Sequence, residues 1–578
     1  MTNKVIARPL KETAELIELT GGNPFRARAL ANAARIVERL EVPVSELIAS
    51  GEIANIKGIG SGLVSQIEEI IAYGSFELRD DILGGLPPGL LDVLSVKGLG
   101  AKKVRALWQK LGIQSLEDLE AAAQTGQIAT LEGFAEKSQQ TILENIAHLR
   151  SYEGKRRISD AWIDADQLQQ LVTSHPAIES VSFGGDIARL MDVVDEIIVV
   201  VKLKAGNTFS PTFIEEVVSS LQLPGVPQTE SRVDSIRVTS SFSDGMPYAI
   251  VFVSAERFGP VLTSEIGPAS FVAQLGLVDA PASLRSEKEV FEWKKLPFIP
   301  PELRDLPQCI ERAEALSELS LLEFSQLKGV LHNHSTYSDG AHSLTDMSLA
   351  VRKAGFGYFG ICDHSQSLKI ASGMSVATAR KQKAEITRLN LGFEKEATAR
   401  IAAPFKVFFG VESDILSDGS LDYEDEMLAE FDFIVASVHV KFNMSEAEAT
   451  DRLIKAISNP YTTILGHPTG RLLLKREGYP IDHKAVLEAC AHYGVAVELN
   501  ANPYRLDLDW RWIETAISLG VLVSINPDAH SIDQLDLMKW GALVARKGGL
   551  TAPGCLNAMT LEQFEAFLQQ RKKPMSVN

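Results

Sequence analysis

Cysteine is scarce in this chain, and long apolar runs are missing. The four cysteines show no C-x-x-C spacing, so they predict neither a structural zinc site nor a redox dithiol. We expect reduced thiols in a cytoplasmic protein. The longest apolar stretches, such as residues 196–201 and 495–499, are short and interrupted, which argues against a membrane span. The first residues, MTNKVIARPLKETAEL, contain no apolar signal core.

Positive charge is also in deficit. Lysine and arginine number 57 against 75 aspartates and glutamates, which gives a net charge of −18. This balance argues against a protein whose whole surface binds polyanions. Local contact with DNA stays open, because backbone amides and a few well-placed basic side chains can hold phosphates. With 578 residues, 45% of them hydrophobic, the chain is predicted to form roughly three or four globular domains.

Histidine is uncommon, and its placement is uneven. Nine of the 11 histidines lie between His332 and His530. Six of them, with three carboxylates, end or follow apolar runs. These nine candidate ligands are His332, His334, Asp339, His364, Glu412, His439, His467, Asp528 and His530. Imidazole and carboxylate groups delivered by separate strands build multinuclear metal sites for hydrolysis, so we predict one such site here.

The C-terminal part alternates strand-like and helical patterns. Strands are predicted at residues 329–332, 358–362, 406–411, 433–438, 462–465, 495–499 and 521–525. This alternation predicts a parallel sheet, for which a closed barrel is the economical arrangement. Such barrels carry their chemistry at the C-terminal ends of the strands. Six of the seven runs lead into a candidate ligand, whereas residues 498–502 are polar without being an obvious ligand set.

The candidate ligands suit phosphoryl chemistry. Alternate strand residues face the same side, so His332 and His334 both point into the mouth of the barrel. A carboxylate such as Glu412 can bridge two cations, and cations roughly 3.5–4 Å apart can hold the attacking and leaving oxygens of a displacement. Histidine with carboxylate ligands favours Zn²⁺ or Mn²⁺. The alternative, that each histidine is a core or capping residue, is weakened by their placement at successive strand ends.

Residues 1–150 are predicted to be helical and to contain three similar glycine turns, each followed by a new helical pattern. The turns resemble helix–hairpin–helix DNA-binding elements, in which glycines let backbone N–H groups approach a phosphate. The candidate DNA-binding residues are Gly58, Gly60, Gly98, Gly100, Lys102, Lys103 and Gly133. The third turn has Ala135 where a second glycine is usual. The alternative is ordinary turns between helices.

The C-terminal motifs resemble the polymerase and histidinol phosphatase (PHP) domain, and specifically the PHP domain fused to bacterial family X DNA polymerases. The motifs are HNHSxxSDG, CDHS, GVExD, SVH, GHPTGR and NPDAH, over about residues 328–568. The resemblance implies a distorted (β/α)7 barrel over residues 328–578 with three divalent ions, Zn²⁺ and/or Mn²⁺. It also implies 3′–5′ exonuclease activity.

The same resemblance implies three ligand sets. The first is His332, His334, Glu412 and Asp528; the second is Glu412, His439 and His467; the third is Asp339, His364 and His530. Glu412 and His439 are expected to take part in catalysis. Arg471 is a candidate phosphate contact, with the alternative that it pairs with a carboxylate at the rim.

Residues 151–300 are expected to be an α+β domain like the nucleotidyltransferase palm and thumb of family X, followed by a linker at residues 301–327. Family X palms hold two metal ions with three aspartates. Here Asp195 matches the first, Ile197 replaces the second, and Ala249 stands at the third in the best register. We therefore expect a palm that keeps its fold but not its chemistry, unless Asp192, Glu196 or Asp234 compensates.

The expected function is a DNA-processing and repair enzyme. It is a metal-dependent 3′–5′ exonuclease acting through the PHP domain on DNA 3′ ends, gapped or single-stranded. We expect a monomer without membrane association. Three alternatives stay open: an active family X polymerase with a proofreading PHP domain, a histidinol-phosphatase-like small-molecule phosphatase, and a DNA-binding scaffold with structural metals. The glycine turns argue against the phosphatase, which needs no DNA-binding module.

Overall fold

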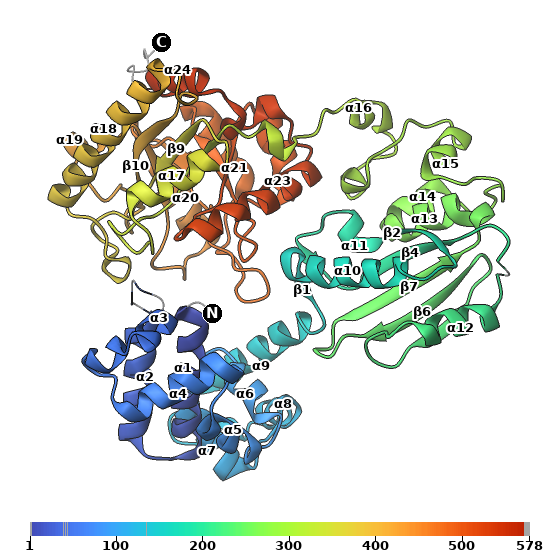
Figure 1. Cartoon of the computed structure of the whole chain (residues 1–578), viewed down its shortest axis with the longest axis horizontal. Helices are drawn as coiled ribbons and strands as arrows, with labels where there is room; N and C mark the ends of the chain where they lie inside the picture. Colours follow the sequence, from blue (N-terminus) through green and yellow to red (C-terminus); the bar gives the residue numbers. More distant parts are fainter. Residues whose placement is uncertain are drawn as a thin grey trace. The chain divides into compact units, whose positions relative to one another are not determined.

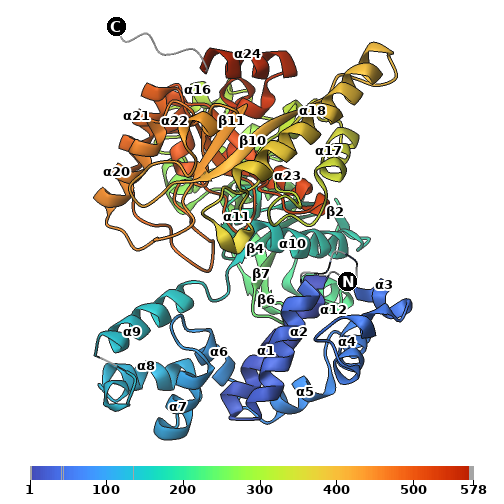
Figure 2. The same cartoon turned by 90° about the vertical axis from the view of Figure 1, so that its left-hand side faces the viewer.

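The computed structural model describes residues 3–38, 40, 42, 44–134, 136–207 and 209–571. The chain forms two compact units, Met1–Glu153 and Gly154–Asn578 (Figures 1 and 2). Among the helices of these described ranges, none combines the length and apolar character needed to cross a bilayer. The four cysteines all lie within the described ranges, where they are buried and form no disulfide.

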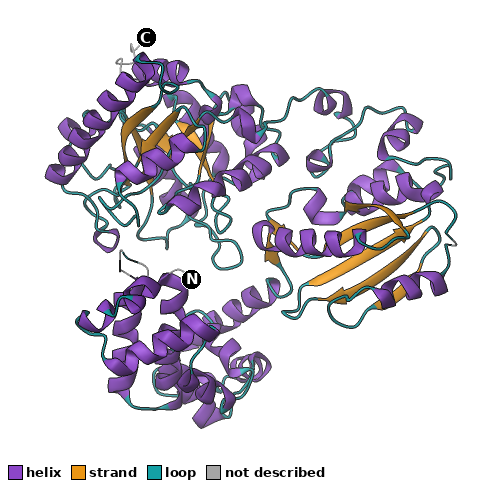
Figure 3. Ribbon diagram, in the orientation of Figure 1, coloured by secondary structure: helices purple, strands orange, loops and turns teal. Residues whose placement is uncertain are grey.

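The described part of the first unit is helical, as the sequence predicts (Figure 3). Its helices are α1 (Asn3–Thr20), α2 (Pro24–Glu38), α3 (Val44–Ala49), α4 (Ser61–Tyr73), α5 (Glu77–Gly84), α6 (Leu90–Ser95), α7 (Ala101–Leu111), α8 (Leu116–Gln124) and α9 (Glu136–Ser151). Apolar residues at helical spacing give each helix one buried face. Those faces form two cores, one centred on α1, α2 and α4 and the other on α6 to α9.

The second unit begins with a mixed region built on one five-stranded sheet. The strands are β2 (Ile178–Phe183), β4 (Ile197–Leu203), β5 (Gln228–Ser231), β6 (Ser235–Ser241) and β7 (Pro247–Val253), in the order β2-β4-β7-β6-β5. Its helices include α10 (Ile158–Thr173), α11 (Gly185–Ala188), α12 (Pro211–Ser220), α13 (Phe258–Ile266), α14 (Ala269–Leu275) and α15 (Glu287–Trp293). All four residues of strand β5 are exposed, so its sequence lacks the alternation of apolar and polar residues that marks a half-buried strand.

The segment 301–327, expected to be a linker, is packed within the second unit. It forms η4 (Pro301–Leu303), α16 (Ala313–Ser317) and η5 (Phe324–Gln326). Leu303 and Leu316 are buried. The Arg304 guanidinium, also buried, donates to Glu287 Oε1 over 2.7 Å and to the carbonyl of Ile299. Burial of these side chains explains why the segment is ordered despite its prolines.

The C-terminal part is a parallel barrel, so the predicted fold class is confirmed (Figure 3). Its strands follow one another in chain order: β8 (Gly329–Val330), β9 (Tyr358–Ile361), β10 (Lys406–Asp414), β11 (Phe433–Ser437), β12 (Ile464–Leu465), β13 (Ala496–Asn500) and β14 (Val523–Asn526). Each strand overlaps one predicted run. A parallel bridge between Asn333 and Ala529 joins the two edge strands just beyond their C-terminal ends. The sheet is therefore nearly closed, and all seven C-terminal ends meet at one mouth.

Helices surround the barrel strands. They are α17 (Leu344–Lys353), α18 (Val376–Thr398), α19 (Asp425–Leu428), α20 (Glu446–Ile457), α21 (His483–Tyr493), α22 (Ile513–Ser518), α23 (Met538–Lys547) and α24 (Leu561–Arg571). Helix α23 also contacts the mixed region. Its last residue, Lys547, is fully buried and donates to the carbonyl of Arg189 over 3.1 Å and to Asp305 Oδ2 over 2.5 Å. Trp540 of α23 lies against Trp162 of α10, with ring centroids 6.1 Å apart.

Replacing Lys547 with methionine should destabilise the second unit by about 3 kcal/mol, because Asp305 loses one of its two cationic partners inside the protein. The midpoint of urea unfolding, followed by tryptophan fluorescence, measures this. The control is Lys539→Met on the exposed side of the same helix, which should shift the free energy of unfolding by no more than about 0.5 kcal/mol. Equal midpoints for the two variants would show that the Lys547 contact contributes nothing.

Candidate metal centre

The nine candidate ligands gather at the mouth of the barrel, around the Glu412 carboxylate of β10. Glu412 Oε1 lies 3.0 Å from His467 Nε2, 3.1 Å from His439 Nε2 and 3.2 Å from His332 Nε2. Glu412 Oε2 lies 2.9 Å from His364 Nδ1. Four imidazoles from four different strand ends thus face one buried carboxylate.

The ligand atoms form three overlapping groups, each within 4.8 Å. They are His332, His334 and Asp528; His334, Asp339, His364 and His530; and His364, Glu412 and His439. The first and second resemble sets implied by the sequence, with His334 shared between them. The third group contains Glu412 and His439 of the second implied set, but it includes His364 and not His467. His467 Nε2 lies beside this group, 3.0 Å from Glu412 Oε1.

The chemistry of the cluster fits divalent cations. Four buried atoms have no hydrogen-bond partner among the described residues: His332 Nε2, His334 Nδ1, His364 Nδ1 and Glu412 Oε2. Buried polar atoms normally have partners, because leaving one unpaired is costly. Ions such as Zn²⁺ bind histidine nitrogen at about 2.0–2.1 Å, so two ligands of one ion lie roughly 3–3.5 Å apart. The separations around Glu412 match this spacing, and the cluster can therefore hold metal ions.

Two carboxylates orient the histidines, and sequence reasoning missed both. Glu498 of β13, fully buried, lies 2.6 Å from His332 Nδ1 and accepts from the backbone N–H of His467 over 2.8 Å. Asp414 Oδ1 lies 2.5 Å from His439 Nδ1. Each contact leaves the other ring nitrogen facing the cluster, as carboxylates behind metal-binding histidines do. For Glu498, the sequence offered one indication of such a role, namely a carboxylate in the middle of an apolar strand, Ala496–Asn500.

Three candidate ligands have unusual backbone conformations. His332, His467 and Asp528 have φ values of 56°, 22° and 51°. These positive values are rare for residues other than glycine and cost about 1–3 kcal/mol each. Each residue follows the end of a strand, where the chain turns sharply into the mouth. The surrounding barrel therefore maintains strain at the ligands, as is common at functional sites.

The charges of the cluster set its protonation. Burial by itself lowers the pKa values of His332, His439 and His530, but neighbouring carboxylates outweigh it at these three residues. Glu498 and Glu412 raise the pKa of His332 well above its ordinary value. Glu412 and Asp414 raise the pKa of His439 to about 10, and Asp339 and Asp528 raise that of His530 to about 9. Burial, with His530 and His364 alongside, lowers the pKa of His334 to about 3.

Arg471, predicted as a phosphate contact, is fully engaged by the protein. Its guanidinium donates to Asp509 and to the carbonyls of Arg505 and Leu506, and over 3.1 Å to Asp192 of the mixed region. The structure shows the alternative stated from the sequence: Arg471 pairs with carboxylates, those of Asp192 and Asp509. In this arrangement Arg471 has no free donor facing the cluster.

The mixed region has a cavity of about 720 Å³ where a palm would bind its nucleotide. Asp195 lies at its edge, with Oδ1 3.6 Å from Lys155 Nζ. Ile197 and Ala249 are buried. The three carboxylates that might have compensated are each paired with an arginine: Asp192 with Arg471, Glu196 with Arg237, and Asp234 with Arg257. No described carboxylates of this cavity form a metal-binding group.

The glycine turns of the first unit share one geometry. Gly58, Gly98 and Gly133 have φ values of 102°, 88° and 89°, which favour glycine. Gly60 and Gly100 are extended and cap the N-termini of α4 and α7, yet a Cβ added at either would meet nothing within 4 Å. Neither backbone strain nor packing within the described residues requires glycine there. Lys102 and Lys103 are exposed beside the second turn, and Ala135 of the third lies outside the described residues.

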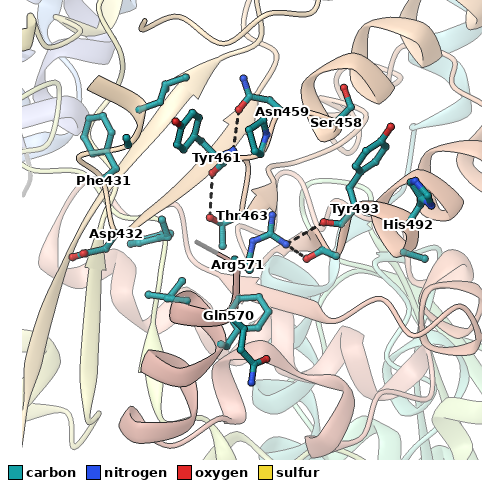
Figure 4. Close-up of a pocket in the computed structure, with 18 residues that line it drawn as sticks. Phe431, Asp432, Ser458, Asn459, Tyr461, Thr463, His492, Tyr493, Gln570 and Arg571 are labelled. Atoms are coloured by element: carbon teal, nitrogen blue, oxygen red, sulfur yellow. Dashed lines mark hydrogen bonds between the residues drawn. The ribbon is translucent and has the colours of Figure 1, made fainter. Parts of the chain in front are cut away.

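A second cavity, of about 880 Å³, opens at the other end of the barrel (Figure 4). It is lined by residues that precede β11 and β12, such as Asp432 and Tyr461, and by the end of α24. Arg571 in this cavity donates to the carbonyls of Tyr493 and Gly494 (Figure 4). It also donates to the carbonyl of Thr462. The cavity lies at the N-terminal ends of the strands, away from the ligand cluster, so its size does not make it the reaction site.

Fold and ligand cluster together define a PHP-type barrel fused to helix–hairpin–helix elements. A PHP domain model matches residues 331–502, a helix–hairpin–helix domain model matches residues 1–76, and a SAM-like helix–hairpin–helix tandem model matches residues 90–147. These matches confirm the resemblances drawn from the motifs and from the glycine turns.

Similarity to a characterised relative extends over nearly the whole chain. The DNA polymerase/3′-5′ exonuclease PolX of Bacillus subtilis (strain 168) is 34% identical over 589 aligned positions, which cover 99% of this chain and 100% of that protein. The chain therefore belongs to the PolX family, the bacterial family X DNA polymerases with a C-terminal PHP domain.

Shorter relatives match less than a third of the chain. A probable phosphatase of Thermoanaerobacter sp. (strain X514) is 28% identical over 29% of this chain and 70% of its own length. A probable phosphatase of Caldanaerobacter subterraneus is 30% identical over 29% of this chain and 67% of its own length.

Binding of divalent ions should release protons. With raised pKa values, His332, His439 and His530 are protonated at pH 7.5 and must become neutral to bind a metal, so we expect release of about two to three protons per chain. Affinity should accordingly rise with pH. Calorimetric titration of chelated protein with Zn²⁺ or Mn²⁺, in buffers of different ionisation enthalpy, counts the protons. Proton uptake, or affinity that falls as pH rises, would contradict this protonation state.

Proposed function

We propose that this chain is a DNA-processing and repair enzyme whose PHP barrel cleaves phosphodiester bonds at DNA 3′ ends. The observation that carries the proposal is the convergence of six histidines and three carboxylates on one barrel mouth, where several buried nitrogen and oxygen atoms have no hydrogen-bond partner among the described residues. Membership of the PolX family, which includes a DNA polymerase/3′-5′ exonuclease, supports the substrate and the polarity.

The proposed cofactors are three divalent ions, Zn²⁺ and/or Mn²⁺, held by the nine ligands. When bound, such ions polarise the scissile phosphate and make hydroxide available near neutral pH. Glu412 then neutralises charge at the centre and fixes the spacing of the ions. Glu498 and Asp414 hold His332 and His439 in orientation, which keeps their Nε2 atoms directed at the cluster.

DNA is supported as the substrate by the glycine turns of the first unit. Gly60 and Gly100 have open space where a side chain would be, which suits close approach of a phosphate to the backbone N–H groups that begin α4 and α7. A small-molecule phosphatase has no use for these elements, and the probable phosphatases match only 29% of this chain. Four buried, unpaired cysteines suit a cytoplasmic enzyme, and we expect a monomer.

We also propose that the mixed region has lost nucleotidyl transfer. Two-metal catalysis needs carboxylates that are free to hold the ions. Only Asp195 remains at the expected positions, and Asp192, Glu196 and Asp234 are each neutralised by an arginine. The region then serves to position DNA or the barrel.

Replacing Glu412 with glutamine should lower exonuclease activity roughly 100-fold or more, because the central carboxylate no longer neutralises and bridges the ions. Digestion of 3′- and 5′-labelled DNA with Mn²⁺ measures the rate and the polarity. Glu394→Gln, on the exposed face of α18, is the matched control and should keep full activity. Unchanged digestion by Glu412→Gln, or digestion only from 5′ ends, would refute the proposed function.

Primer extension tests the loss of polymerase activity separately. With dNTPs and Mg²⁺ or Mn²⁺, a protein whose nuclease is disabled by Glu412→Gln should extend a primer no faster than the same protein carrying Asp195→Ala, since one carboxylate cannot hold two ions. Robust incorporation that disappears on Asp195→Ala would mean that the palm is active, and the alternative of a proofreading polymerase would then hold.

A further inference from the structure

Two loops interlock beside the metal centre. The loop after β12 carries His467, and the loop after β13 follows Glu498. Leu473 donates its backbone N–H to the carbonyl of Tyr504 over 2.7 Å, and Arg471 Nε donates to the carbonyl of Arg505 over 2.9 Å. Because of these contacts, Arg476 and Tyr479 of the first loop lie close to Arg505 of the second.

The Arg505 guanidinium makes few contacts with the described residues. Its Nε lies 3.7 Å from Asp528 Oδ2, on the carboxylate oxygen that faces away from His334. Its guanidinium makes no hydrogen bond to any residue in the described ranges, although its side chain is only 21% exposed. A guanidinium is suited to bidentate contact with a carboxylate or a phosphate. Arg505 therefore borders the ligand cluster with its donors free.

Arg476 and Tyr479 add two buried donors that have no hydrogen-bond partner among the described residues. Arg476 Nη2 donates to the carbonyl of Gly470 over 2.7 Å and the guanidinium stacks on Phe442, but Arg476 Nε is buried and unpaired. The Tyr479 hydroxyl is also unpaired, with the residue 6% exposed. Burial, with Asp507, raises the pKa of Tyr479, so its hydroxyl keeps its proton and can donate.

Among the described residues, the 3.7 Å contact of Arg505 Nε with Asp528 Oδ2 is the one ion pair that these two arginines make with a carboxylate. Burial and the charge of Arg505 both lower the pKa of Arg476. The nearby Asp507 carboxylate forms its hydrogen bonds with Thr469: its two oxygens accept from the Thr469 backbone N–H and hydroxyl, each over 3.0 Å. Two like charges with spare donors, next to a metal cluster, are an arrangement that an anion stabilises.

We infer that Arg476, Tyr479 and Arg505 form a phosphate-binding subsite beside the metal centre, which takes the backbone phosphate next to the scissile one in a DNA strand. This inference rests on the proposed function. The role that the sequence suggested for Arg471 then belongs to Arg505, while Arg471 holds the two loops together. A subsite for a second phosphate favours a polynucleotide over a substrate with a single phosphate.

Steady-state kinetics on two substrates tests the subsite. We compare Arg476→Met and Arg505→Met with Arg380→Met, a control on exposed α18 whose guanidinium pairs with Glu430. The substrates are a single-stranded oligonucleotide and bis(4-nitrophenyl) phosphate, which has one phosphate. Loss of one charge-assisted contact predicts that kcat/KM falls about ten-fold more on the oligonucleotide than on the diester, mainly through KM. The control should not change this ratio.

Equal losses on both substrates, together with a lower metal content by mass spectrometry, would mean that Arg505 only orients Asp528, and would overturn the inference. So would an unchanged ratio. If the wild-type protein hydrolyses neither substrate, the proposed function itself fails.

Binding of inorganic phosphate tests the subsite independently of hydrolysis. It is measured by calorimetry on protein from which a chelator has removed the metal ions. The two variants should bind phosphate about ten-fold more weakly than wild type and Arg380→Met. Equal affinities would overturn the subsite whatever the hydrolytic activity.

Discussion

The contact between the Glu412 carboxylate and four imidazoles is the interaction on which the second unit depends. Burial alone would raise the pKa of Glu412, but His439, His332 and His364 outweigh it and hold that pKa well below the ordinary range. A charged carboxylate at this depth needs positive partners on every side. Only a nearly closed parallel barrel brings so many strand ends to one mouth, and each loop then has to supply just one or two ligands.

Most of the barrel and its ligands could be predicted from the sequence, because apolar runs followed by histidine or carboxylate report both the strands and their ends. The orienting carboxylates could not, since Glu498 resembles any polar residue until β13 is seen to face His332. The positive φ of His467 and Asp528 depends on the closed barrel rather than on local propensity. The sequence left open whether Arg471 contacts a phosphate or pairs with a carboxylate, because one of its partners, Asp192, lies 279 positions away in the chain.

The proposed loss of nucleotidyl transfer leaves the core of the mixed region intact. Its core is made by side chains such as Val199, Val201 and Ile250, which need no metal carboxylates to pack. At the edge of the 720 Å³ cavity of this region, Arg237 lies between Glu196 and Glu265, with contacts of 2.5 and 2.8 Å. An arginine thus balances the negative charge that cations would balance in an active palm. Asp192 and Asp305, paired with Arg471 and Lys547, join this region to the barrel.

Anomalous X-ray scattering from crystals grown with Zn²⁺ or Mn²⁺ tests the central claim most directly, because it locates each ion and identifies it by its absorption edge. We expect peaks at bonding distance from Glu412 and the surrounding histidines, roughly 2.0–2.2 Å for zinc, and none at Asp195. Peaks at Asp195, or an active protein whose crystals show no ion bound to Glu412, would contradict a barrel that is the only working active site.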